Sequence, residues 1–264
     1  MCLQNSFPIK TPMLEYFDQI YVINLESRKD RLQEIREEFN KIGIDFSHPK
    51  FQVFKAIKPE TYDGWPTQGT KGCYLSHLGV LKNAKQNGFE RILILEDDAS
   101  FTQYFNILMD ETIRQLKDTH TENSAWGIFY GGYRACENVD DKITEAYKLN
   151  KLYSKNIFKP LPEHEIFCLH FVAITKPVIA QLVDYLEAIM NKPMGDPTGG
   201  RMHVDGAYNW FRKEHPEITT LMAYPQLAKQ RSSRTDIHEL KWFDVLPFFK
   251  TAAGAARKIK NHLI

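Results

Sequence analysis

Apolar and polar positions alternate along the first half of the chain in blocks that predict strands followed by helices. Residues 19–25 form a β-branched and aromatic run typical of a strand, and apolar residues then recur at helical spacing over 32–42 until Gly43 ends the helix. Residues 51–56 predict a second strand, and a helix with an apolar face follows over 72–87. This order of elements indicates an α/β fold.

The same alternation continues in the second half of the chain. A strand over 126–130 is predicted to end at Gly131-Gly132. Residues 133–165 lack a sustained period, which indicates an irregular insertion or a pair of edge strands. The remaining predicted elements are a helix over 105–116, a strand over 166–174, a helix over 175–189, a loop over 191–200, a helix over 205–214 and a strand over 218–224.

The most informative segment joins a buried strand to three acids. Residues 91–95 include a continuous aliphatic run, typical of a strand buried on both faces of a parallel sheet, and Glu96, Asp97 and Asp98 follow directly. We therefore expect these carboxylates at the carboxyl edge of the sheet, where open α/β sheets bind ligands. Crowded acids repel one another unless a cation or an exposed loop relieves them, and such oxygen ligands suit Mg²⁺ or Mn²⁺. The alternative is a solvated turn that begins the next helix.

The composition mainly excludes some classes of partner and location. With 34 basic and 33 acidic residues the formal net charge is +1, so no overall charge favours nucleic acid as a partner. The four cysteines are widely separated and lack metal-ligand spacing, which is typical of free thiols in a reducing compartment. No signal peptide and no apolar stretch of membrane-spanning length is recognisable, so the predicted location is the cytoplasm.

Three short motifs occur in an order and spacing that resemble a known family. They are Val22-Ile23-Asn24-Leu25 followed by Arg28 and Arg31, then Gly72-Cys73-Tyr74-Leu75-Ser76-His77, and then Ile94-Leu95-Glu96-Asp97-Asp98-Ala99. Looser similarity continues through residues 170–175, Val204-Asp205, residues 224–227, Gln230, Ser233 and Asp236-Ile237. On these residues the chain resembles glycosyltransferase family 25, which includes bacterial lipopolysaccharide and lipooligosaccharide β-galactosyltransferases and is related to the collagen galactosyltransferases.

The resemblance implies a GT-A-like fold, in which a mixed, mainly parallel sheet is flanked by helices, within a single domain over residues 19–240. It implies transfer of galactose from UDP-galactose, with inversion, onto a glycan or glycolipid acceptor such as lipooligosaccharide. It also implies a cation, Mn²⁺ or Mg²⁺, on Glu96 and Asp98, a pair arranged like the Asp-x-Asp signature of GT-A enzymes. An extended backbone turns Asp97 the other way, so Asp97 is assigned to the donor.

Two other classes of protein remain open from the sequence. Clustered acids also serve metal-dependent phosphohydrolases and nucleotidyltransferases, although the chain has no Gly-x-x-x-x-Gly-Lys loop. A non-catalytic sugar-binding protein on the same fold is the second alternative. The donor sugar, the acceptor, the linkage and the oligomeric state are not determined by the sequence.

The turn after the first strand is the next candidate for donor binding. Asn24, Leu25 and Arg28 are assigned to the nucleotide, because such turns and the helix N-termini that follow commonly hold phosphate, and Arg28 offers a planar fork. The alternative is that Arg28 and Arg31 pair with Glu34 or Glu38 on a solvated surface.

A second group of donor residues is carried by the predicted helix over 72–87. Gly72, Ser76 and His77 are assigned to the donor through the family resemblance, and Gly72 would allow the backbone to approach it closely. The alternative for His77 is a buried structural histidine. Cys73 is interpreted as a small packed residue.

Residues for the acceptor and for proton transfer are predicted later in the chain. Tyr130, Gly131 and Gly132 are assigned to the acceptor side, because glycines that end a strand at the ligand edge indicate a site. Asp205 is predicted to be the base that takes the proton of the acceptor hydroxyl. The alternative is that Asp205 caps the helix that it begins.

The two ends of the chain lie outside the predicted domain. Residues 1–18 are interpreted as a lead and residues 241–264 as a basic amphipathic tail. The segment 248–264 carries four Lys or Arg residues and no acid, so we expect it to contact anionic lipid at the inner face of the membrane, where a lipid-linked acceptor would be made. The alternative is an ordinary C-terminal helix or a frayed end.

Overall fold

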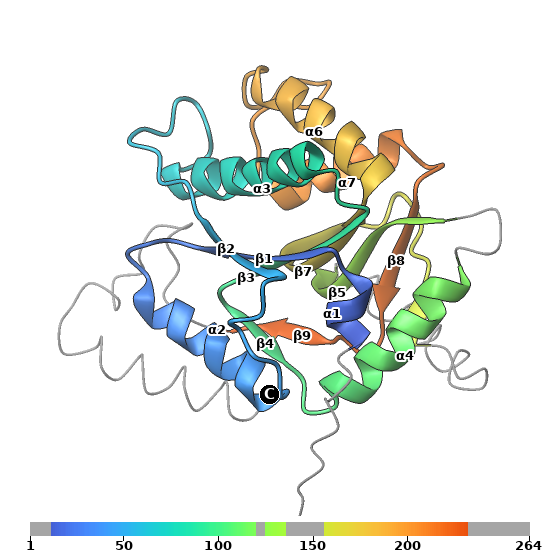
Figure 1. Ribbon diagram of the computed structural model, residues 1–264. Helices are drawn as coiled ribbons and strands as arrows, with labels where there is room; N and C mark the ends of the chain where they lie inside the picture. Colours follow the sequence, from blue (N-terminus) through green and yellow to red (C-terminus); the bar gives the residue numbers. More distant parts are fainter. Residues whose placement is uncertain (1–11, 120–124, 136–155, 232–264) are drawn as a thin grey trace, which may run out of the picture.

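A computed structural model describes residues 12–119, 125–135 and 156–231, and in these ranges a seven-stranded sheet lies between two groups of helices (Figure 1). The helices are α1 (Pro12–Tyr16), α2 (Lys29–Lys41), α3 (Gln68–Asn87), α4 (Phe105–Asp118), α6 (Lys176–Met190) and α7 (Val204–Glu214). The strands of this sheet are β1 (Gln19–Asn24), β2 (Phe51–Lys55), β3 (Arg91–Glu96), β5 (Trp126–Ala135), β6 (Ile157–Phe158), β7 (Ile166–Thr175) and β8 (Thr219–Ala223).

The strand order of the sheet is β2-β1-β3-β7-β5-β8-β6. β1 pairs in parallel with β2 and β3, and β5 pairs in parallel with β8. β7 is antiparallel to both of its neighbours, and β6 is antiparallel to β8. Five strands therefore run one way and two the other, which confirms the predicted α/β class with a mixed, mainly parallel sheet. The pairing also brings the carboxyl ends of β1, β2 and β3 to one edge.

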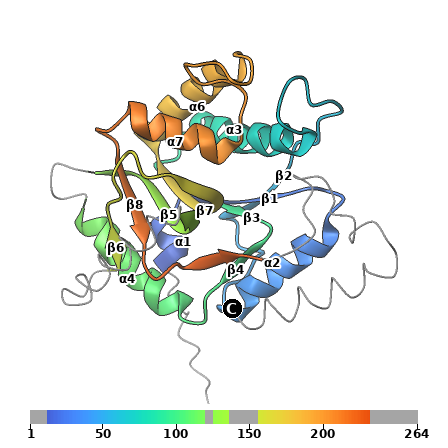
Figure 2. The same ribbon diagram turned by 180° about the vertical axis from the view of Figure 1, so that it is seen from behind.

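Both faces of the sheet are buried, as the aliphatic run of β3 predicts. Ile92 and Ile94 pack in the core under α3, α6 and α7, whereas Leu93 and Leu95 pack on the opposite face under α1, α2 and α4 (Figures 1 and 2). All four side chains are fully buried. Burying each one stabilises the fold by roughly 1.5–3 kcal/mol, so β3 is anchored from both sides and its acidic end is held in place.

The starts of α3 and α7 differ from the sequence prediction. α3 begins at Gln68 rather than Gly72, because Thr67 provides an N-cap whose hydroxyl accepts a 3.0 Å hydrogen bond from the backbone of Thr70. It ends at Gly88, which adopts the left-handed conformation with φ of 69°. α7 begins at Val204, one residue before Asp205.

The prediction that a strand ends at Gly131-Gly132 is wrong. β5 runs through both glycines to Ala135, with irregularities in its register against β7. A Cβ at Gly131 would lie 2.3 Å from the ring of Phe171, and one at Gly132 would lie 2.3 Å from His170 Nε2. The glycines therefore permit close packing within the sheet, and they do not mark its edge.

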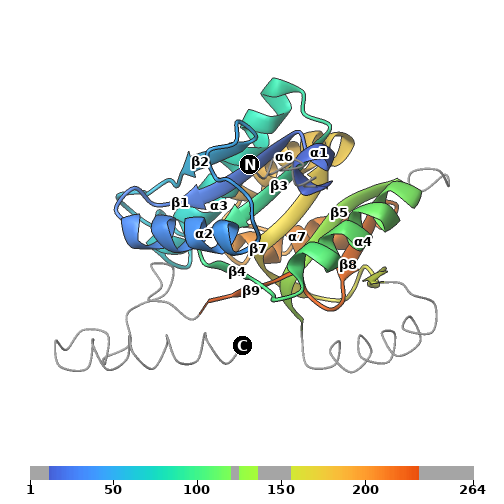
Figure 3. The same cartoon turned by 60° about the horizontal axis from the view of Figure 1, so that its bottom comes forward.

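A second, two-stranded sheet brings the end of the described chain back to the acids. β4 (Ala99–Phe101) pairs antiparallel with β9 (Ala228–Gln230), and the two lie side by side in Figure 3. The register places Ala99 opposite Gln230. Because Ala99 directly follows Asp98, this pairing places Gln230 and Arg231 beside the acids.

The first described residues, from Pro12 onward, pack into the hydrophobic core. Met13, Tyr16 and Phe17 are buried in the core that α2 and α4 share. Residues 1–11 and 232–264 lie outside the described residues, so the predicted domain limits and the C-terminal tail stay predictions, and the same holds for most of the predicted insertion over 133–165. Among the described helices, none has the length and apolar character to cross a membrane.

Candidate functional site

The carboxyl ends of β1, β2 and β3 open into a cavity of about 830 Å³, within the usual size of small-molecule sites, ~300–1,000 Å³. Its lining comes from the segments that follow these three strands, from α3, from β5 and β7, from the start of α7 and from the end of β9. Of the residues predicted for the site, the lining includes Leu25, Gly72, Ser76, His77, Glu96, Asp97, Asp98 and Asp205. Asn24, Arg28, Tyr130, Gly131 and Gly132 are not part of it.

The three acids at the end of β3 have three different sets of partners. His77 Nε2 lies 3.1 Å from Glu96 Oε1. Burial alone would raise the pKa of Glu96, but the hydrogen bond from His77 and the nearby positive groups outweigh it, and the pKa is lowered. Asp97 accepts a 2.7 Å hydrogen bond from the side-chain amide of Asn24 and a 2.9 Å bond from Arg31. Asn24 therefore does not line the cavity, but its hydrogen bond holds the Asp97 side chain, which does.

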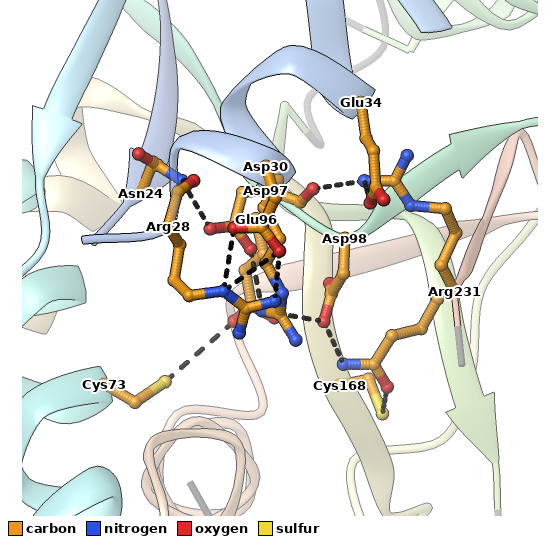
Figure 4. Close-up of polar contacts among 12 residues, drawn as sticks. Asn24, Arg28, Asp30, Glu34, Cys73, Glu96, Asp97, Asp98, Cys168 and Arg231 are labelled. Carbon is orange, nitrogen blue, oxygen red and sulfur yellow. Dashed lines mark hydrogen bonds and ion pairs between the residues drawn. The ribbon is translucent and has the colours of Figure 1, made fainter. Parts of the chain in front are cut away.

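Asp98 is the least satisfied of the three acids (Figure 4). One carboxylate oxygen accepts a 3.3 Å hydrogen bond from Gln230 and lies 3.7 Å from Arg31 NH1. The other oxygen, Oδ1, is buried and has no hydrogen-bond partner among the described residues. Burial and the adjacent Glu96 carboxylate raise the pKa of Asp98 to about 7. A buried carboxylate with an unused oxygen beside a second acid is a group that a cation would stabilise.

Arg31, rather than Arg28, reaches the cavity. Arg28 precedes α2 and binds the exposed Asp30, 2.9 Å away, so its assignment to the cavity is not supported by the geometry. Arg31 lies within α2, turns inward and lines the cavity beside Asp97 and Asp98. The sequence alone does not distinguish the two arginines, because their spacing does not tell which of them faces the edge of the sheet.

On α3, Gly72 and Ser76 hold a loop in place. A Cβ at Gly72 would lie 2.6 Å from the backbone oxygen of Ile57, so the close approach that this glycine allows is to the segment after β2. The Ser76 hydroxyl accepts a 2.8 Å hydrogen bond from the Ile57 backbone and donates a 2.6 Å bond to the Gly72 carbonyl. Both residues line the cavity while fixing one of its walls.

Tyr130 is fully buried in the core between the sheet and α7, and its hydroxyl has no partner among the described residues. Together with the packing role of Gly131 and Gly132, this leaves the three residues predicted for the acceptor outside the cavity lining. Its wall on this side is formed by Arg134, farther along β5, and by Cys168 and Leu169 of β7. The strand continues past the glycines, so the exposed end of β5 lies farther along the chain than the pattern indicates.

Asp205 faces the cavity from the first turn of α7. The alternative that Asp205 caps this helix is wrong, because His203 occupies the N-cap position. The carboxylate accepts a 3.1 Å hydrogen bond from the backbone of Cys168 and a 2.9 Å bond from that of Gly206. Cys168, whose backbone N–H makes the first of these bonds, has a φ of 66°, which is unusual for a residue other than glycine.

Several basic or polar residues of the cavity are not recognisable from the sequence as site residues. They are Lys58, Arg134, His203, Gln230 and Arg231. The Arg231 guanidinium lies 3.4 Å from Glu34, and its backbone N–H donates a 2.8 Å hydrogen bond to the Asp98 carbonyl. The only sequence signal for this group is the loose motif that contains Gln230, because the three-residue pairing of β4 with β9 has no local pattern.

An α/β sheet with an acidic cavity at the carboxyl edge of its first parallel strands defines a ligand-binding protein of the open α/β class. The sequence model of glycosyltransferase family 25, described as LPS biosynthesis protein, matches residues 17–65 and 66–164, which is more than half of the chain. The chain therefore belongs to glycosyltransferase family 25.

Individual relatives cover smaller parts. The chain is 26% identical over 152 residues to procollagen galactosyltransferase 1-B of Xenopus laevis, across 52% of this chain and 24% of that protein. It is 28% identical over 139 residues to a glycosyltransferase 25 family member of Aedes aegypti, across 47% and 22%. A human relative, inactive glycosyltransferase 25 family member 3, is 26% identical over 155 residues, across 53% and 26%. The chain spans about a quarter of the length of these curated relatives.

Among solved structures, mouse xyloside xylosyltransferase 1 in its apo form aligns over 75% of this chain and 68% of that chain. The identity is 12% and the TM-score is 0.33, which is too low to indicate a shared function.

Proposed function

We propose that this protein is an active, metal-assisted glycosyltransferase that moves galactose from UDP-galactose, with inversion, onto a glycan acceptor such as lipooligosaccharide. Membership of family 25 supports the transfer of a sugar. The choice of galactose is supported by the procollagen galactosyltransferases of Xenopus laevis, and the choice of acceptor by the family's description as LPS biosynthesis protein.

The observation that carries the proposal is the state of Asp98. Its buried Oδ1 has no partner among the described residues, and Glu96 lies two positions before it on the same cavity wall. Oxygen ligands of this kind fit a hard divalent cation such as Mn²⁺ or Mg²⁺, and we assign that cation to Glu96 and Asp98. When bound, the cation would supply positive charge against the diphosphate that leaves as the glycosidic bond of the donor breaks.

The other charged residues of the cavity divide between the donor and the acceptor. Arg31 neutralises Asp97 and adds positive charge beside Asp98, which supports binding of a diphosphate there. Leu25 lines the same wall and is assigned to the nucleoside. Asp205 approaches from α7 on another wall, where we assign it the role of the base that accepts the proton of the acceptor hydroxyl.

We further propose that the protein acts in the cytoplasm and contacts the inner face of the membrane through residues 241–264. The support is the concentration of basic residues in this segment, which carries no acid from residue 248 onward. A glycolipid acceptor would then be presented to the cavity at the membrane surface.

Calorimetry tests the central premise. UDP is titrated into the full chain with Mn²⁺ or with a chelator, and we expect clearly tighter binding with Mn²⁺, a difference that Asp98→Ala abolishes without loss of the folded circular dichroism signal. The exposed Asp110 of α4 provides the matched control, because Asp110→Ala removes an acid outside the cavity. Equal UDP affinity with and without the metal would contradict the proposal.

Product analysis separates the three classes of protein. With UDP-galactose and a lipooligosaccharide acceptor, a transferase forms a new glycoside. A phosphohydrolase would release phosphate without an acceptor, and a sugar-binding protein would do neither.

A further inference from the structure

A second group of metal-ligating side chains borders the cavity. Cys73 and His77 lie four residues apart on α3 and therefore project from the same side of the helix, toward Glu96 at the end of β3. Glu96 Oε1 is 3.1 Å from His77 Nε2 and 4.0 Å from Cys73 Sγ. One ligand atom from each of the three residues lies within 4.8 Å of the other two. Figure 4 shows the Cys73 sulfur directed toward Glu96.

This set of ligand atoms differs in chemistry from the acids alone. A thiolate, an imidazole and a carboxylate together suit Zn²⁺, whereas Mn²⁺ and Mg²⁺ prefer oxygen ligands. Two of the three ligands stand one turn apart on a single helix, the spacing by which helices commonly present two ligands to one metal. Three protein ligands also leave one tetrahedral position open. All three residues line the cavity, so that position can be filled by water.

The helix that carries two of the ligands is closely packed. His77 is fully buried and α3 is packed against the sheet through Tyr74, Leu78 and Leu81, so neither ligand on the helix has to move far. Binding of a cation would displace the proton of the Cys73 thiol, as it does at zinc thiolates in general.

We propose that Cys73, His77 and Glu96 form a second metal site, selective for a soft divalent cation of the zinc class, which competes with the donor-side cation for Glu96. The binding itself is independent of the proposed function, whereas the competition rests on it. Because coupling between two ligands is reciprocal, zinc bound at this site would weaken Mn²⁺-dependent UDP binding, and Mn²⁺ with UDP would weaken zinc binding by the same factor.

Cobalt spectroscopy tests the binding. Co²⁺ is titrated into the untagged full chain carrying Cys2→Ser and Cys136→Ser, which removes the two thiols outside the described residues. We expect a near-ultraviolet thiolate-to-cobalt charge-transfer band that Zn²⁺ displaces. It should be absent in Cys73→Ser and retained in Cys168→Ser, whose thiol faces Gln230, and in Asp98→Asn. Absence of the band, or its persistence in Cys73→Ser, would overturn the site.

Calorimetry with UDP and Mn²⁺ tests the competition. Stoichiometric Zn²⁺ should weaken UDP binding on the order of tenfold in the parent chain and leave it unchanged in Cys73→Ser. If Zn²⁺ weakened UDP binding equally in both proteins, it would be replacing Mn²⁺ at the donor-side site that includes Asp98. The proposal that the two metal sites share Glu96 would then be wrong. If UDP binding does not depend on Mn²⁺ at all, the proposed function fails, while the cobalt result stands by itself.

Discussion

The guanidinium of Arg31 lies 2.9 Å from the carboxylate of Asp97, and the two side chains are only 12% and 9% exposed. Arg31 on α2 thus neutralises an acid at the end of β3, although the two residues lie 66 positions apart in the sequence. The same group is 3.7 Å from Asp98, so Arg31 places positive charge beside two of the three acids, while His77 contacts the third, Glu96.

We therefore expect Arg31→Gln to destabilise the fold. Removing one partner of a mostly buried ion pair leaves the other charge uncompensated, and the free energy of unfolding should fall by about 3 kcal/mol in urea denaturation. Mn²⁺ should restore part of this loss, because a cation at Glu96 and Asp98 relieves the same repulsion.

Arg114→Gln is the matched control for this change. Arg114 pairs with Glu111 and Asp118 on the exposed side of α4, so its loss should leave the unfolding midpoint essentially unchanged. If Arg31→Gln were as stable as Arg114→Gln in chelator, the neutralising role of Arg31 would be wrong.

Asp205→Asn should separate catalysis from binding. The amide cannot accept the proton of the acceptor hydroxyl, so transfer should fall by on the order of a hundredfold or more, while Mn²⁺-dependent UDP binding is unchanged. A small decrease in melting temperature is expected as well, because the amide oxygen can replace only one of the two hydrogen bonds from Cys168 and Gly206.

Asp184→Asn, on the exposed face of α6, provides the reference for this experiment. Full turnover of Asp205→Asn would remove Asp205 as the base and direct attention to His203, which also lines the cavity.

Gly132→Ala should be poorly tolerated. Its Cβ would lie 2.6 Å from the backbone oxygen of Ala228 as well as against His170, so β9 would have to shift away from β5. Overpacking of this kind costs about 1–3 kcal/mol, and the displacement of β9 should also weaken Mn²⁺-dependent UDP binding, because Gln230 holds Asp98.

Gly206→Ala is the control, because the structure leaves room for a Cβ at this glycine. Within α7 the added Cβ would meet only the flexible side chain of Met202, at 3.3 Å, and alanine favours a helix by about 1 kcal/mol over glycine. Thermal melting should rank Gly206→Ala at or above the parent chain and Gly132→Ala below it. The reverse order would contradict the packing interpretation of the β5 glycines.

The basic C-terminal segment is expected to bind anionic vesicles. In a flotation assay the full chain should rise with vesicles containing phosphatidylglycerol and stay behind with neutral phosphatidylcholine, and deletion from Thr251 onward should abolish the difference. Replacing Lys250, Arg257, Lys258 and Lys260 by Gln keeps the length and removes the charge. Binding that survives the deletion would exclude this segment as the anchor.

The sequence by itself determined most of the elements of the main sheet and its helices, and the position of the acids, but not α1, β4 or β9. Hydrophobic periodicity is a local property, so the order of strands and helices was readable, and a strand with aliphatic residues on both faces could only lie inside a sheet covered on both sides. The acids after that strand had to emerge at the carboxyl edge, where the cavity lies. The three main family motifs, which contain Asn24, His77 and Glu96, fall on the same edge of the sheet.

The tertiary structure alone decided which side chains meet the acids. Arg28 and Arg31 are equivalent in the sequence, and only the packing of α2 turns Arg31 inward. Gln230 arrives through pairing across more than a hundred residues, and the β5 glycines are explained by rings on β7, from a distant part of the chain. Such contacts depend on how whole elements pack against one another, and no periodicity within a single segment encodes them.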